Sequence, residues 1–186
     1  MCSNTEKMKK VIAFAGSNSR ASINKKLAEY AAKQLQDVEV TVLDLNDFEL
    51  PLYGIDIENK DGIPQAAHTF LEYIKQADGI VLSLAEHNGA YATVFKNLFD
   101  WMSRIDGKLW SNVPMLLMAA SPGGRGGATV LDIAKGRFPY MGGAVVATFS
   151  LPNFNTNFSA EGIKDETLAA AFNEALELFE EAVKKQ

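Results

Sequence analysis

A polar turn near the start of the chain has the residue types that bind a phosphate group. The apolar run 11–15 ends at Gly16, and a segment rich in hydroxyl and amide side chains follows before a helical pattern begins. The first N–H groups of a helix are unpaired and its dipole is positive there, so an anion is stabilised at that end. Arg20 can neutralise a doubly charged phosphate through two parallel hydrogen bonds. The candidate phosphate-binding residues are Ser17, Asn18, Ser19, Arg20, Ser22, Ile23 and Asn24.

This turn differs from two familiar nucleotide-binding loops. It lacks the GxGxxG spacing that lets a backbone approach a dinucleotide pyrophosphate, and it lacks the GxxxxGK[ST] spacing of a P-loop. A turn rich in Ser and Asn instead suits a terminal phosphate monoester, such as the tail of FMN. The alternative is that Ser22 only caps the helix and that the other polar residues only form a solvated turn.

The composition of the chain narrows the classes of partner. Its 186 residues are 47% hydrophobic and 22% charged, with a net charge of −5, so we expect a globular protein that does not bind nucleic acid. Cys2 is the only cysteine, and His68 and His87 lie far apart in the sequence, so we expect no metal site. No secretory signal or membrane-spanning run is visible, and a cytoplasmic location is the expectation.

Strand and helix patterns alternate from residue 11 onward. We predict strands at 11–15, 38–43, 79–84, 113–120 and 144–149. We predict one helix that begins at residue 23 and others that span 65–77, 92–105, 128–138 and 165–184. Segment 45–64 is interpreted as a long connection. The alternation predicts one α/β domain over residues 1–186, with a loose tail at 1–9. We expect a flavodoxin-like three-layer sandwich, in which a five-stranded parallel sheet of order 2-1-3-4-5 has helices on both faces.

Two further loops contain unusual residues and follow predicted strands. With this strand order, the loops after the first, third and fourth strands meet at the carboxyl edge of the sheet, where ligands bind. Glycines there let the backbone approach a flat ligand and direct N–H groups toward the N1/O2 edge of a flavin. The candidate residues of these loops are Ala85, Glu86, His87, Asn88 and Gly89 in one, and Ser121, Pro122, Gly123, Gly124 and Arg125 in the other.

Each of these loops also has a plainer interpretation. The segment 121–127 can be a mobile glycine-rich turn with a solvated arginine. His87 can be an ordinary exposed histidine, and Glu86 can be an acid in a turn. No nucleophile accompanies them at a catalytic spacing, so we assign no catalytic acid, base or nucleophile.

Three separated motifs resemble those of the NADPH-dependent FMN reductase family. GSNSRASINKKLA is similar to its opening GSxRxxSxNxxLA, AEHNGAYATVFKNLFDWMSR to its second signature PEYNxxxPxxLKNxxDW, and SPGGRGG to its third flavin loop. The resemblance implies bound FMN, with the first loop around the phosphate and the other two beside the ring. The chain departs from the family at Ala85, His87 and Thr93, which replace Pro, Tyr and Pro. Proline is the stiffer residue, so the second loop is expected to be less rigid.

The resemblance also implies an activity and a partner. We expect NADPH or NADH to reduce the flavin and a small acceptor to take two electrons from it at the same place. The acceptor would be a quinone, an azo compound, a free flavin or a metal oxyanion, and a shared site implies ping-pong kinetics. The alternatives are a flavodoxin-like electron carrier without its own NAD(P)H turnover, and a binding domain without redox chemistry.

The helix at 92–105 is relevant to the oligomeric state. Its apolar residues exceed one core-facing stripe, so the helix is either buried on two sides or in contact with another subunit. The resemblance favours a homodimer or a homotetramer.

Overall fold

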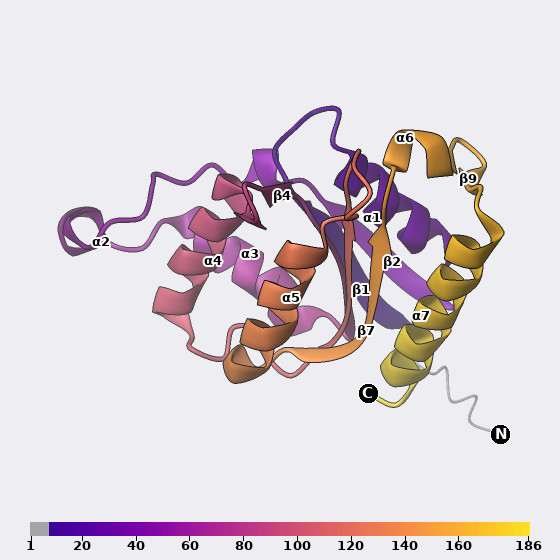
Figure 1. Cartoon of the computed structure of the whole chain (residues 1–186). Coiled ribbons are helices and arrows are strands. Elements are labelled where there is room, and N and C mark those ends of the chain that lie inside the picture. Colours follow the sequence, from indigo (N-terminus) through magenta and orange to yellow (C-terminus); the bar gives the residue numbers. More distant parts are fainter. Residues whose placement is uncertain (1–7) are drawn as a thin grey trace, which may run out of the picture.

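A computed structural model of the chain describes residues 8–186, which form three layers (Figure 1). The central layer is a parallel sheet in the order β2-β1-β3-β6-β7. Its strands are β1 (Lys9–Gly16), β2 (Val38–Leu43), β3 (Gly79–Leu84), β6 (Pro114–Ala120) and β7 (Ala144–Leu151). This order confirms the predicted fold class, because the five strands, numbered among themselves, follow 2-1-3-4-5.

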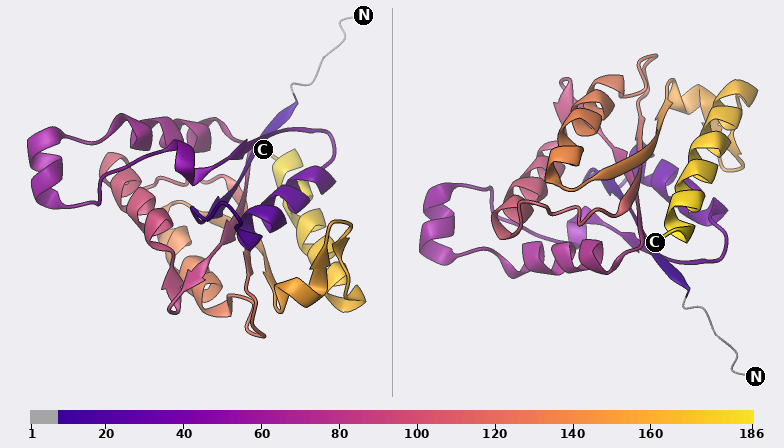
Figure 2. Two further views of the ribbon diagram at one scale, coloured as in Figure 1. Left: turned by 90° about the horizontal axis from the view of Figure 1, so that it is seen from above. Right: turned by 90° about the horizontal axis from the view of Figure 1, so that it is seen from below.

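Helices cover both faces of the sheet (Figures 1 and 2). On one face lie α1 (Ile23–Gln34) and α7 (Glu166–Lys184), and on the other lie α3 (Gln65–Gln76), α4 (Thr93–Ile105) and α5 (Ala128–Arg137). Each face has its own hydrophobic core, and every residue of β3 and β6 is buried between them. Strands buried on both sides are near-continuous apolar runs, which is why their positions were evident in the sequence.

The structure adds short elements where the sequence suggested only connections. Segment 45–64 contains the 3-10 turn η1 (Leu45–Asp47) and the helix α2 (Ile55–Asp61). Loop 85–91 is a hairpin of β4 (Glu86–His87) and β5 (Ala90–Tyr91), and η2 (Phe138–Met141) follows α5. Beyond β7 lie α6 (Phe154–Asn157) and the hairpin of β8 (Phe158–Ser159) and β9 (Gly162–Ile163). The prediction of five helices and open loops was therefore too simple.

The tail prediction is also corrected at its end. Strand β1 begins at Lys9, two residues earlier than predicted, so residue 9 belongs to the sheet and not to a loose tail. Met8, also in the predicted tail, is exposed and precedes the strand, and residues 1–7 lie outside the described residues. None of the helices in 8–186 is long and apolar enough to span a bilayer.

Candidate functional site

The turn after β1 presents unpaired donors at the start of α1. Ser22 caps the helix, since its hydroxyl accepts a hydrogen bond from the N–H of Lys25 at 3.1 Å. Among the described residues, none accepts a hydrogen bond from the N–H of Ile23 or of Asn24. Arg20 is exposed and pairs with no described residue. The capping role of Ser22 is therefore present together with free donors for an anion, and the two interpretations of the turn are compatible.

The other hydroxyls and amides of this turn lie at the surface. Asn18 and Ser19 are exposed and Ser17 is half-buried. The Ser17 hydroxyl accepts a hydrogen bond from the N–H of Ser19 at 3.2 Å, which holds the turn open between β1 and α1. All three side chains are accessible to a ligand at the head of the helix.

The side chain of Asn24, one of the candidate phosphate-binding residues, points into the protein. Its side chain is buried, with 3% of its surface exposed. The amide oxygen accepts hydrogen bonds from the hydroxyl of Ser83 and from the N–H of Ala120, both at 2.8 Å, and the amide nitrogen donates to the carbonyl of Ala120 at 3.2 Å. The side chain of Asn24 is thus engaged inside the protein, and only its backbone N–H faces the turn as a free donor.

The hairpin after β3 is held in place by its own turn and by Glu86. Asn88 and Gly89 have φ values of +52° and +74°, as required of both central residues in a two-residue type I′ turn. A carboxylate oxygen of Glu86 accepts a hydrogen bond from the N–H of Val130 at 3.0 Å, in the first turn of α5. This contact connects the hairpin to the helix that follows loop 121–127. His87 remains exposed on the hairpin, and Ala85 is buried beneath it.

The far end of the hairpin is anchored by an aromatic side chain. The ring of Tyr91 packs at 5.3 Å from that of Phe95 and is stacked on that of Phe138 at 6.3 Å. Burial raises the pKa of Tyr91 to about 12, so its phenol stays neutral near pH 7. The hydroxyl is buried and has no hydrogen-bond partner among the described residues.

Loop 121–127 contains two kinds of glycine. At Gly126 and Gly127 φ is +60° and +77°, and a Cβ would lie 2.9 Å from the backbone nitrogen of Pro152 and 2.7 Å from the Cβ of Ala119, respectively. These two glycines are required by the fold. At Gly123 a Cβ would meet nothing within 4 Å, so nothing in the surrounding fold requires glycine there. A glycine with open space in front of it suits the close approach of a ligand.

The same loop presents a row of free backbone donors. Among the described residues, none accepts a hydrogen bond from the N–H of Gly123, Gly124 or Arg125. Two hydrogen bonds connect the loop to β7 and the segment after it. The carbonyl of Gly123 accepts from the N–H of Asn153, and the carbonyl of Gly126 accepts from the hydroxyl of Ser150, both at 3.0 Å. These contacts argue against a mobile turn, and none of them uses the N–H groups of residues 123–125.

The remaining side chains of this loop are oriented by local contacts. The hydroxyl of Ser121 donates to the carbonyl of Gly123 at 2.9 Å. The guanidinium of Arg125 donates to the hydroxyl of Thr129 at 2.9 Å, and Pro122 is exposed. The side chain of Arg125 is therefore bonded to the first turn of α5. The plainer interpretation, a solvated arginine without a protein partner, does not describe it.

An ion pair that the sequence did not suggest connects α1 to the segment after β2. The ammonium of Lys25 donates a hydrogen bond to the carboxylate of Asp44. This bond lowers the pKa of Asp44 below its ordinary value of 3.8 and raises the pKa of Lys25 above its ordinary value of 10.5, and burial opposes both shifts. Asp44 also caps η1, because it accepts from the N–H of Asn46 at 2.9 Å.

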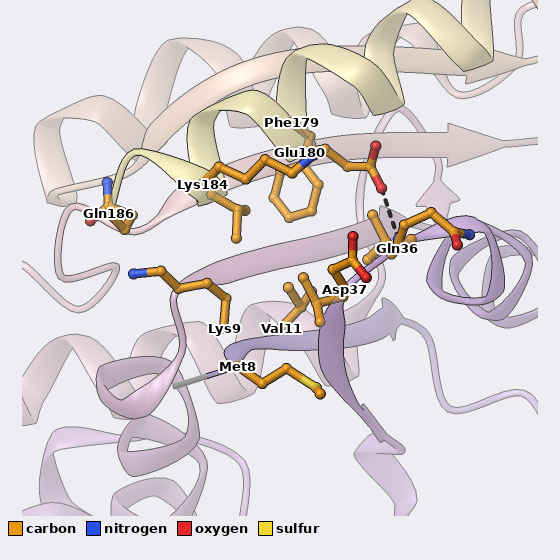
Figure 3. A pocket seen from close by; sticks show the side chains of 12 residues that line it. Met8, Lys9, Val11, Gln36, Asp37, Phe179, Glu180, Lys184 and Gln186 are labelled. Atoms are coloured by element: carbon orange, nitrogen blue, oxygen red, sulfur yellow. Dashed lines mark hydrogen bonds between the residues drawn. The ribbon is translucent and has the colours of Figure 1, made fainter. Parts of the chain in front are cut away.

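Two hollows lie at opposite edges of the sheet. One, of about 610 Å³, is at the carboxyl edge beside the phosphate turn; its lining includes Asn18, Phe48, Glu49, Leu50 and Asn97. The larger, of about 790 Å³, is at the amino edge between the starts of β1 and β2 and the end of α7 (Figure 3). In the larger hollow the carboxylate of Glu180 already accepts from the N–H of Gln36 at 2.9 Å. The larger volume therefore does not coincide with the free donors.

The apolar excess of α4 is explained within the chain. Phe95, Phe99 and Met102 are buried in the core, while Trp101 is buried beneath the segment that leads to α2 and donates its indole N–H to the carbonyl of Pro51 at 2.8 Å. The first alternative, a helix buried on two sides, is the correct one. The composition of this helix accordingly gives no argument for another subunit.

The described residues contain no cluster of three or more His, Cys, Asp or Glu side chains placed to hold a metal ion. The groups that converge at the carboxyl edge are instead backbone N–H donors, hydroxyls and two arginines. Such a set binds an anion at one end and a flat polar edge at the other.

Comparison with known proteins identifies a matching family. The sequence profile described as NADPH-dependent FMN reductase matches residues 9–156. A quinone reductase of Escherichia coli strain K12 is 32% identical over 122 residues, which is 63% of this chain and 63% of that protein. A 2-hydroxy-1,4-benzoquinone reductase of a Burkholderia species is 31% identical over 134 residues, 71% of each chain.

A solved structure extends the likeness to the whole fold. The flavoenzyme NAD(P)H:(acceptor) oxidoreductase FerB from Paracoccus denitrificans superposes with a TM-score of 0.76 at 24% identity, over 95% of this chain and 98% of that one. At this identity the superposition supports the fold alone.

Proposed function

Since the chain belongs to the NADPH-dependent FMN reductase family, we propose that it is an NAD(P)H-dependent reductase that holds FMN at the carboxyl edge of its sheet. The observation that supports this most strongly is the pairing of two donor sets on one edge. The N–H groups of Ile23 and Asn24 are free at one end, and those of Gly123, Gly124 and Arg125 are free at the other. FMN has an anionic phosphate and a flat ring with carbonyl acceptors, and it matches both ends.

The residues of the phosphate end hold and neutralise charge. Arg20, with the helix dipole and the two free N–H groups of α1, stabilises a dianionic phosphate, and the hydroxyls of Ser17 and Ser19 are close enough in sequence to add donors. The carboxylate of Asp44, in the segment after β2, is neutralised by its ion pair with Lys25 of α1.

The residues of the ring end supply position and electrostatics. Bound FMN would provide the redox chemistry, namely hydride acceptance from NADPH or NADH and transfer of two electrons to an acceptor. The N–H groups at 123–125 would stabilise negative charge on the pyrimidine edge of a ring bound beside them. Open space in front of Gly123 lets a ring approach the backbone. No side chain is assigned as an acid or a base.

We propose a quinone as the acceptor class and ping-pong kinetics as the order of events. Two relatives at 32% and 31% identity are named as quinone reductases, which supports this class over azo compounds, free flavins and oxyanions. One open ring face that serves both the reductant and the acceptor would require the oxidised nicotinamide to leave first. Parallel double-reciprocal plots with NADPH and benzoquinone are the expected result.

An anaerobic titration distinguishes this proposal from an electron carrier. The protein reconstituted with FMN should be yellow and should bleach when NADPH or NADH is added, and benzoquinone should restore the colour. A carrier would stay yellow with either nicotinamide and bleach only when a separate reductase is present. Protein that cannot be loaded with FMN would contradict both and favour a binding domain without redox chemistry.

We also propose a homodimer, or a homotetramer built from two dimers, on the basis of the family resemblance. The segment around α2 extends from the body of the molecule (Figures 1 and 2), and it exposes Leu52 and Ile55 at 69% and 52%. Light scattering after size exclusion should give twice or four times the mass of 20.3 kDa. A monomer at micromolar concentration would reject this part of the proposal.

A further inference from the structure

The side chain of Asn24 occupies a position that a strand would otherwise fill. The N–H of Ser121 bonds to the carbonyl of Leu151, in β7. Successive residues of a strand direct their backbone groups to opposite sides, so those of Ala120 are directed away from β7, toward β3. Strand β3 ends at Leu84, which pairs with Ala119, so Ala120 has no paired residue in β3.

The amide of Asn24 completes this ladder from a helix. It accepts from the N–H of Ala120 at 2.8 Å and donates to its carbonyl at 3.2 Å, as a neighbouring strand residue would do. The carboxyl end of β6 is thereby bonded directly to the first turn of α1. This is a direct bond between the two elements that carry the phosphate turn and loop 121–127.

A second buried polar residue fixes the orientation of that amide. Ser83 is fully buried in β3, at 0% exposure, where every other residue is apolar or glycine. Its hydroxyl donates to the amide oxygen of Asn24 at 2.8 Å. The oxygen then has both of its acceptor positions occupied, so the amide cannot rotate without losing two buried hydrogen bonds.

We propose that Asn24 and Ser83 are positioning residues that fix the distance between the phosphate end and the ring end of the FMN site. This inference rests on the proposed function. FMN binds as two linked parts, a phosphate and a ring, and linked parts bind together tightly only when the two sites have the matching separation. The side-chain bonds of the link Ser83–Asn24–Ala120 set that separation. Only the backbone N–H of Asn24, which both Asn24→Ala and Ser83→Ala retain, is proposed to contact the phosphate.

The link predicts a specific pattern of affinities. Riboflavin has the ring without the phosphate, and inorganic phosphate has no ring, so each needs only one end of the site. A change in the separation of the two ends should lower the affinity for FMN and leave the affinities for riboflavin and inorganic phosphate nearly unchanged. Substitution of a residue that binds phosphate directly would instead lower the affinities for both FMN and inorganic phosphate.

The experiment uses the full chain freed of flavin, in four versions: the natural protein, Ser83→Ala, Asn24→Ala and Ser103→Ala. Ser103 is the matched control, because its hydroxyl bonds to the carbonyl of Asp100 within α4, away from the link. FMN and riboflavin affinities are measured from flavin fluorescence. Phosphate affinity is measured from the shift of the thermal midpoint with phosphate concentration. Ser83→Ala deletes one hydroxyl and provides the test if Asn24→Ala does not fold.

We expect Ser83→Ala and Asn24→Ala to lower the affinity for FMN by about tenfold or more. The affinities for riboflavin and phosphate should change by less than about twofold. Ser103→Ala should leave all three affinities unchanged. Unchanged FMN affinity in both link variants would overturn the inference, and so would an equal loss of phosphate affinity or an equal loss for all three ligands. Failure of the natural protein to bind FMN would be a different result, which overturns the proposed function and this inference together.

Discussion

The two edges of the sheet differ in what their loops offer to a ligand. At the amino edge, the hollow of about 790 Å³ is lined by side chains of mixed charge, including Lys9, Asp37 and Glu180, and one of these is already bonded to a neighbouring backbone N–H (Figure 3). At the carboxyl edge, the hollow is smaller, about 610 Å³, and Asn18 is the one residue of the phosphate turn in its lining. The N–H groups of Ile23, Asn24 and residues 123–125, on loops at the same edge, have no acceptor among the described residues.

The larger hollow and the free backbone donors therefore lie at different edges of the sheet. Donors are useful to a ligand when the protein has already fixed their positions, because little ordering remains to be done on binding. At the carboxyl edge, Asn24, Glu86 and Ser150 provide this fixation through buried or half-buried hydrogen bonds. Each variant below changes one residue at the carboxyl edge. Its effect on FMN affinity or on the free energy of unfolding is compared with that of a control variant or condition.

The largest effect is expected from Gly126→Ala. Its φ of +60° disfavours any other residue, and the new Cβ would lie 2.9 Å from the backbone nitrogen of Pro152, so the end of β7 would have to move. We expect a loss of about 2–4 kcal/mol in the free energy of unfolding, measured with urea. Gly123→Ala is the matched control and should change this free energy by less than about 0.5 kcal/mol. Equal losses in the two variants would show that the two glycines do not differ as described.

The next effect is on FMN affinity. Arg20→Gln removes the free guanidinium of the phosphate turn, and charge-assisted hydrogen bonds contribute about 1.5–3 kcal/mol, so the Kd should rise about 10- to 100-fold. Lys184→Gln removes a cation from the amino-edge hollow and should leave the Kd within about twofold. Fluorescence titration measures both. A larger effect from Lys184 than from Arg20 would reverse the comparison of the two edges.

These features were visible in the sequence to different degrees. The central strands β3 and β6 were evident as near-continuous apolar runs, and β2 was predicted from its apolar/polar alternation. The strand order followed from the alternation of strands and helices, read as a flavodoxin-like arrangement. Asn24 was predicted at the phosphate from its place in a polar turn and from the family motif, and this stays a prediction. The burial of its side chain could not be predicted, because it depends on Ser83 and Ala120, which are distant in sequence. The helix α2 was missed because it buries no residue and so has no apolar stripe.

The hairpin could have been predicted. The pair Asn88–Gly89 is a strong local signal for a two-residue turn, and the sequence interpretation gave these residues a ligand role instead. The inward contact of Glu86, by contrast, depends on where α5 begins in space, and no local pattern indicates it.

A smaller effect is expected from Glu86→Gln. The amide can still accept the hydrogen bond from Val130, but the negative charge at the N-terminal end of α5 is lost. We expect a loss of about 0.3–1 kcal/mol in unfolding free energy at low salt, which decreases as salt is added. Glu177→Gln on the exposed side of α7 is the control and should be neutral. An effect that is independent of salt would argue against the dipole contribution.

The smallest effect concerns Asp44→Asn and its pH dependence. Because the pKa of Asp44 is lowered in the folded state, its ion pair stabilises the protein above the ordinary value of 3.8 and is lost as the pH falls through the lowered pKa. The raised pKa of Lys25 keeps the pair intact up to at least pH 10.5. We expect Asp44→Asn to cost about 0.2–1 kcal/mol at pH 7, since the pair is partly exposed, and progressively less below pH 4. A cost that grows toward acid pH would contradict the assignment.

The most direct test of the proposed site is a crystal structure of the protein with FMN. We predict the phosphate within hydrogen-bond distance of the N–H groups of Ile23 and Asn24, and the ring between the hairpin 86–91 and loop 121–127. FMN in the amino-edge hollow, or with its phosphate away from the start of α1, would contradict the account.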